Sequence, residues 1–308
     1  MKKGILCSIL LLGIFTVQAQ TTISETLKYN DVEKISINLE EIAYREMGSG
    51  DTTLLFIHGL SSNLEAWNKN IAALKDKYKC IAIDLPGYGK SSKNKLDHSI
   101  TDYADVIHQF IQKKDLKQTI LIGHSMGGQI AIRSVLDYPA DFLKLILIAP
   151  AGIETFSAGE AQIMKASYTP VMLREATEEQ IRANFLINFH EFPEDAEFMV
   201  EDRIAMKKAS DFENYSQIVV NNIHAMLDEP VIEELSKIKI PVLMIFGSND
   251  ALIPNKYFHR DQDLEMLSNI AKEKLPQLEV KIIEDAGHFV NFEKAEIVNK
   301  EMSYFLKE

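Results

Sequence analysis

Residues 119–128 read Thr119-Ile120-Leu121-Ile122-Gly123-His124-Ser125-Met126-Gly127-Gly128. The apolar residues before Gly123 favour a buried strand, and those after Gly127 recur at helical spacing. Between them stands the pattern G-x-S-x-G, which predicts a tight, strained strand-to-helix turn at Ser125. The glycines permit such a turn, because a Cβ at either one would clash with neighbouring backbone. The helix dipole at this point favours developing negative charge, so Ser125 is a candidate nucleophile.

Short apolar runs similar to 119–122 recur along the chain. Their length and uniform hydrophobicity are typical of strands buried on both faces of a parallel sheet. Stretches with helical spacing, such as 100–113 and 128–138, separate most of them, which predicts an α/β sheet with helices on both faces. An alternating segment at 34–46 predicts an antiparallel hairpin at the sheet edge. The further runs are 53–57, 80–83, 145–148, 242–246 and 280–283.

The strand pattern stops between residues 151 and 237. Apolar side chains at helical spacing replace it, namely Phe185, Phe189, Phe192, Phe198, Met199 and Met206. A stretch of this length is longer than ordinary crossover helices, which are the alternative, and favours a helical cap inserted into one sheet. The predicted division is a core at 20–150 and 238–308 with a cap at 151–237.

The first 19 residues have the pattern of an export signal. A basic Lys2-Lys3 pair precedes the apolar run 5–15, and Val17-Gln18-Ala19 predicts cleavage after Ala19. The alternative is a membrane anchor, but the run is shorter than the roughly 20 apolar residues needed to span a bilayer. We therefore expect a periplasmic or secreted protein without stable membrane insertion. Cys80, the only cysteine after the signal, is expected to be a buried, inert thiol.

Composition excludes several classes of function. The 308-residue chain has a formal net charge of −12, which disfavours nucleic-acid binding. Clustered Cys and His ligands and the H-E-x-x-H motif are absent, so we expect neither a metal nor a cofactor. Residues 84–91 fit neither a phosphate-binding loop nor a dinucleotide fingerprint, because Asp84 and Ser92 stand where glycines are required. A structural loop is the better interpretation.

A serine nucleophile needs a base, and the base needs an orienting acid. His288 follows the run 280–283, at the end of a strand, and is the predicted base. Asp250 follows the run 242–246 and is preferred to Asp228 and Asp285 as the acid, which gives the chain order Ser, Asp, His. The other candidate bases lie in helical or cap stretches without strand-end context, namely His98, His108, His190, His224 and His259.

The oxyanion formed on attack needs hydrogen-bond donors aimed at it. One predicted donor is the backbone N–H of Met126, directly after the nucleophile. The second is the N–H of Leu60 in the loop after the run 53–57, where Gly59 allows a tight turn. His58 is expected to brace this loop by hydrogen bonds.

Together these residues resemble the α/β-hydrolase superfamily from about residue 40 to the C-terminus. The matching motifs are His58-Gly59, Asp84-Leu85-Pro86-Gly87-Tyr88-Gly89, Gly123-His124-Ser125-Met126-Gly127-Gly128, Asp250 and Gly287-His288. The resemblance implies an α/β fold with a mostly parallel eight-stranded sheet and a helical cap. Within the superfamily the chain is most similar to monoacylglycerol lipases and carboxylesterases, on 125–129, 149–152 and the cap segment 177–193.

The expected activity is hydrolysis of a small-molecule acyl ester through an acyl-enzyme. C–C bond hydrolysis or perhydrolysis by the same three side chains stays open, as does a non-catalytic ligand-binding role on the same fold. A structural surface protein would have no use for Ser125, Asp250 and His288 in this order. Oligomeric state, acyl-chain length and the alcohol portion are left open.

Overall fold

The computed structural model describes residues 21–307, and the predicted export signal lies outside them. Within this range one eight-stranded sheet has the order β1-β2-β4-β3-β5-β6-β7-β8. β2 pairs antiparallel with β1 and with β4, and all other neighbours are parallel. The strands are β1 Glu33–Ile37, β2 Glu40–Met47, β3 Thr53–Ile57, β4 Lys79–Ile83, β5 Thr119–His124, β6 Phe142–Ile148, β7 Val242–Gly247 and β8 Leu278–Ile283.

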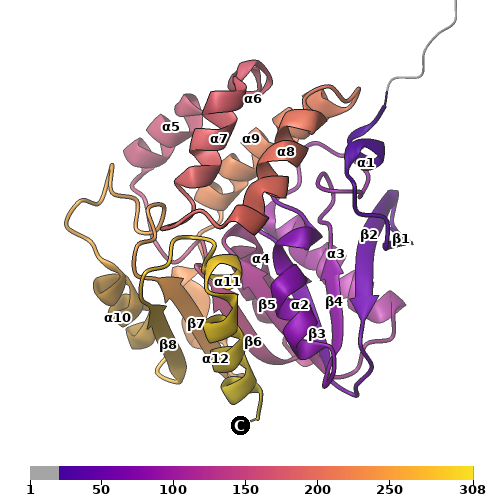
Figure 1. Cartoon of the computed structure of the whole chain (residues 1–308). Coiled ribbons are helices and arrows are strands. Elements are labelled where there is room, and N and C mark those ends of the chain that lie inside the picture. The colour runs from indigo at the N-terminus through magenta and orange to yellow at the C-terminus, as the bar shows by residue number, and fades with distance from the viewer. Residues whose placement is uncertain (1–20, 308) are drawn as a thin grey trace, which may run out of the picture.

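The predicted fold class and its edge hairpin are confirmed. β3, β5 and β7 are buried along their whole length, since helices cover both faces of the sheet. α2 and α12 lie on one face and α3, α4 and α10 on the other (Figure 1). The helices of these two layers are α2 Asn68–Leu74, α3 Ile100–Lys113, α4 Met126–Asp137, α10 Leu264–Lys274, α11 Val290–Glu293 and α12 Ala295–Lys307.

Between β6 and β7 the chain forms a separate group of helices, which lie over the carboxyl ends of the central strands (Figure 1). They are α5 Ala158–Ser167, α6 Pro170–Glu175, α7 Glu178–Leu186, α8 Glu197–Met206 and α9 Phe212–Asp228. We call residues 151–237, which contain these helices, the cap. Five of the six cap side chains that showed helical spacing pack in one apolar cluster with Phe289 and Phe292 of the core, and Met206 joins the main core.

The segment 21–30 lies between the cap and the sheet domain. It contains α1 Ile23–Thr26, whose Ile23 amide donates to Asp211 in the cap at 2.7 Å. The Tyr29 hydroxyl donates at 2.6 Å to Asp84, which is fully buried and also accepts the Lys90 amide at 2.7 Å. The loop at 84–91 is therefore structural, as expected. Cys80 is free and buried, and burial raises the pKa of its thiol to about 12.

Candidate active site

Ser125 occupies a strained turn between β5 and α4. Its φ and ψ are 53° and −119°, and its amide donates to the Ile148 carbonyl at 2.9 Å. A Cβ on Gly123 would lie 2.2 Å from the Gly127 carbonyl oxygen, and one on Gly127 would lie 2.4 Å from that of Ile57. Real side chains cannot approach so closely, so both positions require glycine. The turn therefore holds the hydroxyl beyond the end of β5.

Asp250 and His288 follow β7 and β8 and form a buried pair. The His288 Nδ1 and Asp250 Oδ2 atoms are 2.8 Å apart, and the two side chains are 4% and 0% exposed. The other Asp250 oxygen accepts the amides of Leu252 at 2.8 Å and Ile253 at 3.0 Å. A carboxylate held in this way requires the ring proton on Nδ1, which leaves the Nε2 lone pair of His288 free to accept a proton.

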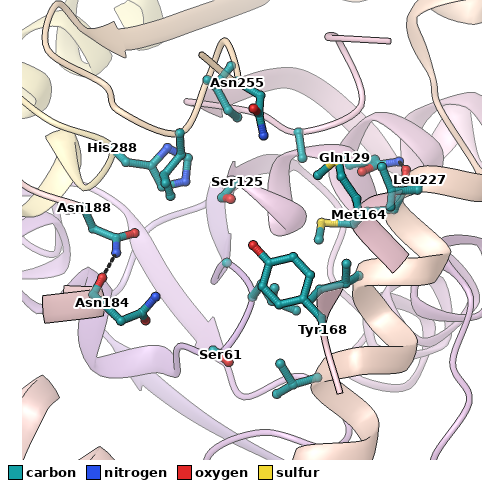
Figure 2. Close-up of a pocket in the computed structure, with 18 of the residues that line it drawn as sticks. Ser61, Ser125, Gln129, Met164, Tyr168, Asn184, Asn188, Leu227, Asn255 and His288 are labelled. Carbon is teal, nitrogen blue, oxygen red and sulfur yellow. Dashed lines mark hydrogen bonds between the residues drawn. The ribbon is translucent and has the colours of Figure 1, made fainter. Parts of the chain in front are cut away.

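Ser125 and His288 line the same cavity. Figure 2 shows the Ser125 hydroxyl and the His288 ring in the wall of one pocket. In the part of the chain that the structure describes, no direct hydrogen bond joins the two groups. Such bonds are often long before substrate binds and tighten in the reacting complex. The structure thus brings all three predicted residues to one edge of the sheet. Of the two hydrogen bonds expected among them, the one between His288 and Asp250 is present.

The two predicted oxyanion donors lie beside Ser125. Met126 is the first residue of α4, where an N–H has no acceptor within the helix. A Cβ on Gly59 would lie 3.1 Å from the Ser125 Cβ, so the loop containing Leu60 packs directly against Ser125. Neither the Leu60 nor the Met126 N–H donates to an acceptor among residues 21–307. Two unused donors therefore flank the serine.

His58 braces this loop, as its position predicted. Its Nδ1 donates to the Gly59 carbonyl at 2.8 Å, and its Nε2 accepts the Leu85 amide at 3.0 Å. Complete burial lowers the pKa of His58 to about 4. The ring is consequently neutral at physiological pH, with one nitrogen donating and the other accepting.

His124, the second residue of the G-x-S-x-G pattern, has a structural role that the sequence did not predict. Its Nε2 donates to the backbone carbonyl of His288 at 3.0 Å. Its ring lies 4.9 Å from the His288 ring and 4.6 Å from that of Phe289, centroid to centroid. Burial, and then the neighbouring His288, keep the pKa of His124 well below its usual value. A neutral ring thus holds the loop that carries His288.

Glu293 in α11 is a second residue that sequence reasoning missed. Its carboxylate accepts the Gly287 amide at 2.8 Å in the loop of His288. It also accepts two cap amides, those of Glu191 at 2.7 Å and His190 at 3.1 Å. The contact joins segments about 100 residues apart, and no local pattern around Glu293 signals it. This carboxylate therefore links the cap to the loop of His288, beside the hydrogen bond at 3.0 Å from the Phe289 amide to the Asn188 carbonyl.

The cavity next to Ser125 has a volume of about 500 Å³ and lies between the sheet and the cap. Its apolar wall comes mainly from α5, α6 and α9, and includes Met164, Tyr168, Met172, Leu173, Phe212, Val219, Ile223, Met226 and Leu227. None of the six Phe and Met residues that showed helical spacing in the cap sequence borders it. Those six side chains pack instead within the cap and against the core.

Polar groups also line the cavity, and one of them, Glu154, pairs with His259 behind it. The His259 Nδ1 contacts the Glu154 carboxylate, which also accepts the Asn255 amide at 2.9 Å. Burial raises the pKa of Glu154, while these hydrogen bonds act in the opposite direction. His259 lies in a loop after β7, so its expected place in a helical or cap stretch is wrong; His98 also lies outside the helices. Within residues 21–307, no group of three His, Cys, Asp or Glu side chains could hold a metal ion.

The fold and the serine at a strand-to-helix turn are those of a hydrolase family. The chain belongs to the alpha/beta hydrolase fold family, whose sequence model matches residues 52–295. It is 26% identical over 266 residues to uncharacterized hydrolase YugF of Bacillus subtilis (strain 168), covering 84% of this chain and 91% of that one. It is also 26% identical over 298 residues to 2-hydroxy-6-oxononadienedioate/2-hydroxy-6-oxononatrienedioate hydrolase of Escherichia coli O81 (strain ED1a), covering 94% and 98%.

Solved structures show the same fold. A probable hydrolytic enzyme from Pseudomonas aeruginosa PAO1 superposes with a TM-score of 0.79 at 21% identity, over 92% of this chain and 97% of that one. An esterase from Exiguobacterium antarcticum gives 0.72 at 22% identity, over 87% and 96%. The predicted superfamily is therefore confirmed, and the chain is a member of a hydrolase family.

Proposed function

We propose that this protein is a serine hydrolase that cleaves carboxylic esters with an apolar acyl group. One observation carries the proposal. Ser125 and the Asp250-paired ring of His288 border the same cavity, whose wall is largely apolar. A mostly apolar pocket with a few convergent polar groups is the usual form of a small-molecule site.

The geometry supports a two-step mechanism. The Ser125 oxygen attacks the ester carbonyl while its proton passes to Nε2 of His288, and Asp250 stabilises the resulting imidazolium. The N–H groups of Leu60 and Met126 donate to the oxyanion. Collapse expels the alcohol, which takes the proton from His288, and leaves an acyl group on Ser125. Water, deprotonated by His288, then releases the acid and regenerates the serine.

Ser125→Ala tests the assignment directly. We expect this variant to lose turnover of 4-nitrophenyl esters and covalent labelling by a fluorophosphonate, because both need the hydroxyl. Ser236→Ala, at an exposed cap serine, is the matched control and should behave like the wild type. Wild-type turnover in the Ser125 variant would reject the proposal. Absence of labelling in the wild type would favour a binding protein on the same fold.

C–C bond hydrolysis is a second candidate, and one comparison favours it. The Escherichia coli relative named above is a hydrolase of 2-hydroxy-6-oxo dienedioates and matches nearly the whole of both chains. The same serine, base and oxyanion donors would serve such a reaction. Comparing kcat/KM for esters of two to twelve carbons with that for a 2-hydroxy-6-oxo dienedioate distinguishes the two. A kcat/KM more than tenfold higher for the 2-hydroxy-6-oxo dienedioate than for any ester would reject the ester proposal in favour of C–C bond hydrolysis.

We also propose that the protein is exported and loses residues 1–19. The support is the basic pair, apolar run and small-residue site in the sequence. Among the residues that the structure describes, no helix is both long and apolar enough to cross a bilayer. N-terminal sequencing of protein from a bacterial host should find Gln20 first. A retained apolar run would show that the segment serves as an anchor.

A further inference from the structure

Arg203 in α8 is a cap residue that reaches the oxyanion loop. Its Nη2 donates to the backbone carbonyl of Ser61, directly after Leu60. The guanidinium lies over two aromatic rings, 5.5 Å from the centroid of Phe185 and 5.4 Å from that of Tyr215. Within residues 21–307 it forms no ion pair, and its Nε is buried without a partner. This arginine therefore does not serve the cap as part of a salt bridge.

Ser61 has a strained backbone conformation inside a turn, which the Ser62 amide closes on the Gly59 carbonyl at 3.2 Å. Its φ is 60°, in the left-handed region that residues other than glycine seldom adopt. Such conformations persist where the surroundings over-determine them. Here the Ser61 carbonyl accepts from Arg203 and, at 3.5 Å, from the Tyr215 hydroxyl. Both donors belong to the cap.

The loop is thus held from both sides. On the core side, His58 donates to the Gly59 carbonyl at 2.8 Å. On the cap side, Arg203 holds the Ser61 carbonyl. Leu60 lies between these two anchors, and its N–H is one of the two unused donors beside Ser125. The Ser61 carbonyl belongs to the Ser61–Ser62 peptide and the Leu60 N–H to the Gly59–Leu60 peptide. A rotation of the first would be transmitted to the second, because only the Leu60–Ser61 peptide lies between them.

We propose that Arg203 is a positioning residue for the oxyanion hole. It fixes the carbonyl of Ser61, the residue after Leu60, and so couples seating of the cap to a complete pair of oxyanion donors. The inference rests on the proposed serine-hydrolase function, since it requires an oxyanion at Ser125. A lysine would retain the charge and one donor, but not the flat surface that stacks against the two rings.

The test compares Arg203→Met and Arg203→Lys with a matched control. Arg182→Met alters another cap arginine, which is exposed, paired with Glu197 and not part of the cavity wall. The substrate is 4-nitrophenyl acetate, whose acyl group is too short to depend on the apolar wall of the cap. The measurements are kcat, KM, the affinity for a trifluoromethyl ketone as tetrahedral mimic, the rate of fluorophosphonate labelling and Tm.

We expect Arg203→Met to lower kcat about 10- to 100-fold, a fraction of the ~10²–10³ that loss of one oxyanion donor costs. KM should change less than about twofold, because the ground-state carbonyl depends little on the hole. Affinity for the ketone and the labelling rate should fall by the same factor as kcat. Arg203→Lys should recover part of the loss, and Arg182→Met should match the wild type. A variant that is only less stable would show a lower Tm, but its kcat, ketone affinity and labelling rate would not fall together.

Two results would overturn the proposal. The first is an unchanged kcat on the acetate with unchanged ketone affinity in Arg203→Met. The second is a loss confined to KM for long-chain or carboxylate-bearing esters, which would make Arg203 a substrate contact. If the wild type and Arg182→Met hydrolyse no ester, the ester proposal fails instead. The labelling rate still decides the role of Arg203 in that case, since labelling needs the oxyanion hole but no ester substrate.

Discussion

Asp250 has two separable tasks at the scale of single residues. One oxygen fixes its own loop through the Leu252 and Ile253 amides, and the other accepts from His288. Asp250→Asn preserves the first task, because an amide oxygen can still accept both N–H groups. It disrupts the second, since an amide NH₂ facing Nδ1 favours the wrong ring tautomer. We expect kcat to fall about 10²- to 10⁴-fold, with Tm nearly unchanged.

Steady-state kinetics and a thermal melt of the same preparation check this prediction. Asp285→Asn is the control, because Asp285 is exposed and lies three residues before His288 without contacting its ring. An Asp250→Asn enzyme with wild-type kcat would show that the buried pair does not orient a base.

Asp202, next to Arg203, gives a prediction about pH. Burial, with the nearby carboxylates Glu65 and Glu201, raises the pKa of Asp202 to about 6 from an ordinary 3.8. Between these values the folded protein keeps a proton that the unfolded chain has released, so raising the pH from about 4 to about 6 favours unfolding. Asp202→Asn removes this titration. The variant should melt higher than the wild type above pH 6, and the difference should shrink as the pH falls towards 4.

Thermal melts at half-unit steps between pH 4 and pH 8 measure the effect. Glu179→Gln is a suitable control, since Glu179 is an exposed glutamate of the cap that does not contribute to the raised pKa of Asp202. A constant difference in Tm across the whole range would mean that Asp202 does not titrate within it.

At the scale of elements, the sheet was predictable because burial constrains its strands on both faces. The runs at 53–57 and 242–246 contain no alternating polar residues, so their sequence alone predicts strands inside the sheet that are buried on both faces. Ser125, Asp250 and His288 were found for a related reason, since carboxyl ends of parallel strands meet at one edge. The cavity wall was not predictable. Helical spacing at Phe185 and Phe189 shows that one face is buried, but not whether it meets a ligand or the core.

Glu293 shows what element-level pattern cannot reveal, and it provides a test. Its carboxylate is the only described acceptor shared by the His288 loop and the cap segment 190–191. Glu293→Gln replaces one oxygen by a donor that repels at least one of three N–H groups. Each charge-assisted hydrogen bond contributes about 1.5–3 kcal/mol, and solvent reduces this at a half-buried site. We expect faster amide exchange at 187–192 and 286–289 and a moderate loss of kcat.

Hydrogen-exchange mass spectrometry localises the effect. Glu296→Gln, at an exposed glutamate in α12, is the control and should leave both segments protected. Equal exchange in the Glu293 variant and the wild type would mean that packing of Phe189 on Phe289, with ring centroids 5.3 Å apart, holds the two segments without the carboxylate.

At the scale of the whole molecule, segment 21–30 joins the cap to the sheet domain. Ile23 and Leu27 are 0% and 2% exposed. On the cap side, the Ser210 amide donates to the Thr21 carbonyl at 3.0 Å, next to the contact between Ile23 and Asp211. On the core side, Lys90 donates to the Ser24 carbonyl at 2.8 Å. Direct hydrogen bonds also join the cap to the core, as at Asn222 in α9, which accepts from the hydroxyls of Tyr88 at 2.5 Å and Tyr103 at 2.9 Å. The segment should add to these contacts in stabilising the seated cap.

A chain that begins at Asp31 tests this role against one that begins at Thr21. Burying Ile23 and Leu27 contributes about 1.5–3 kcal/mol each, so the shorter chain should melt at least about 5 °C lower. Because α8 carries Arg203 and lies beside α1, its amides should also exchange faster, and kcat should fall with them. Tyr29→Phe removes only the hydrogen bond to Asp84 and should cause a smaller change in the same direction. An unchanged melting temperature and unchanged α8 exchange in the shorter chain would contradict this prediction. The cap would then be held by its own contacts with the sheet domain, and segment 21–30 would bind to a surface that is formed without it.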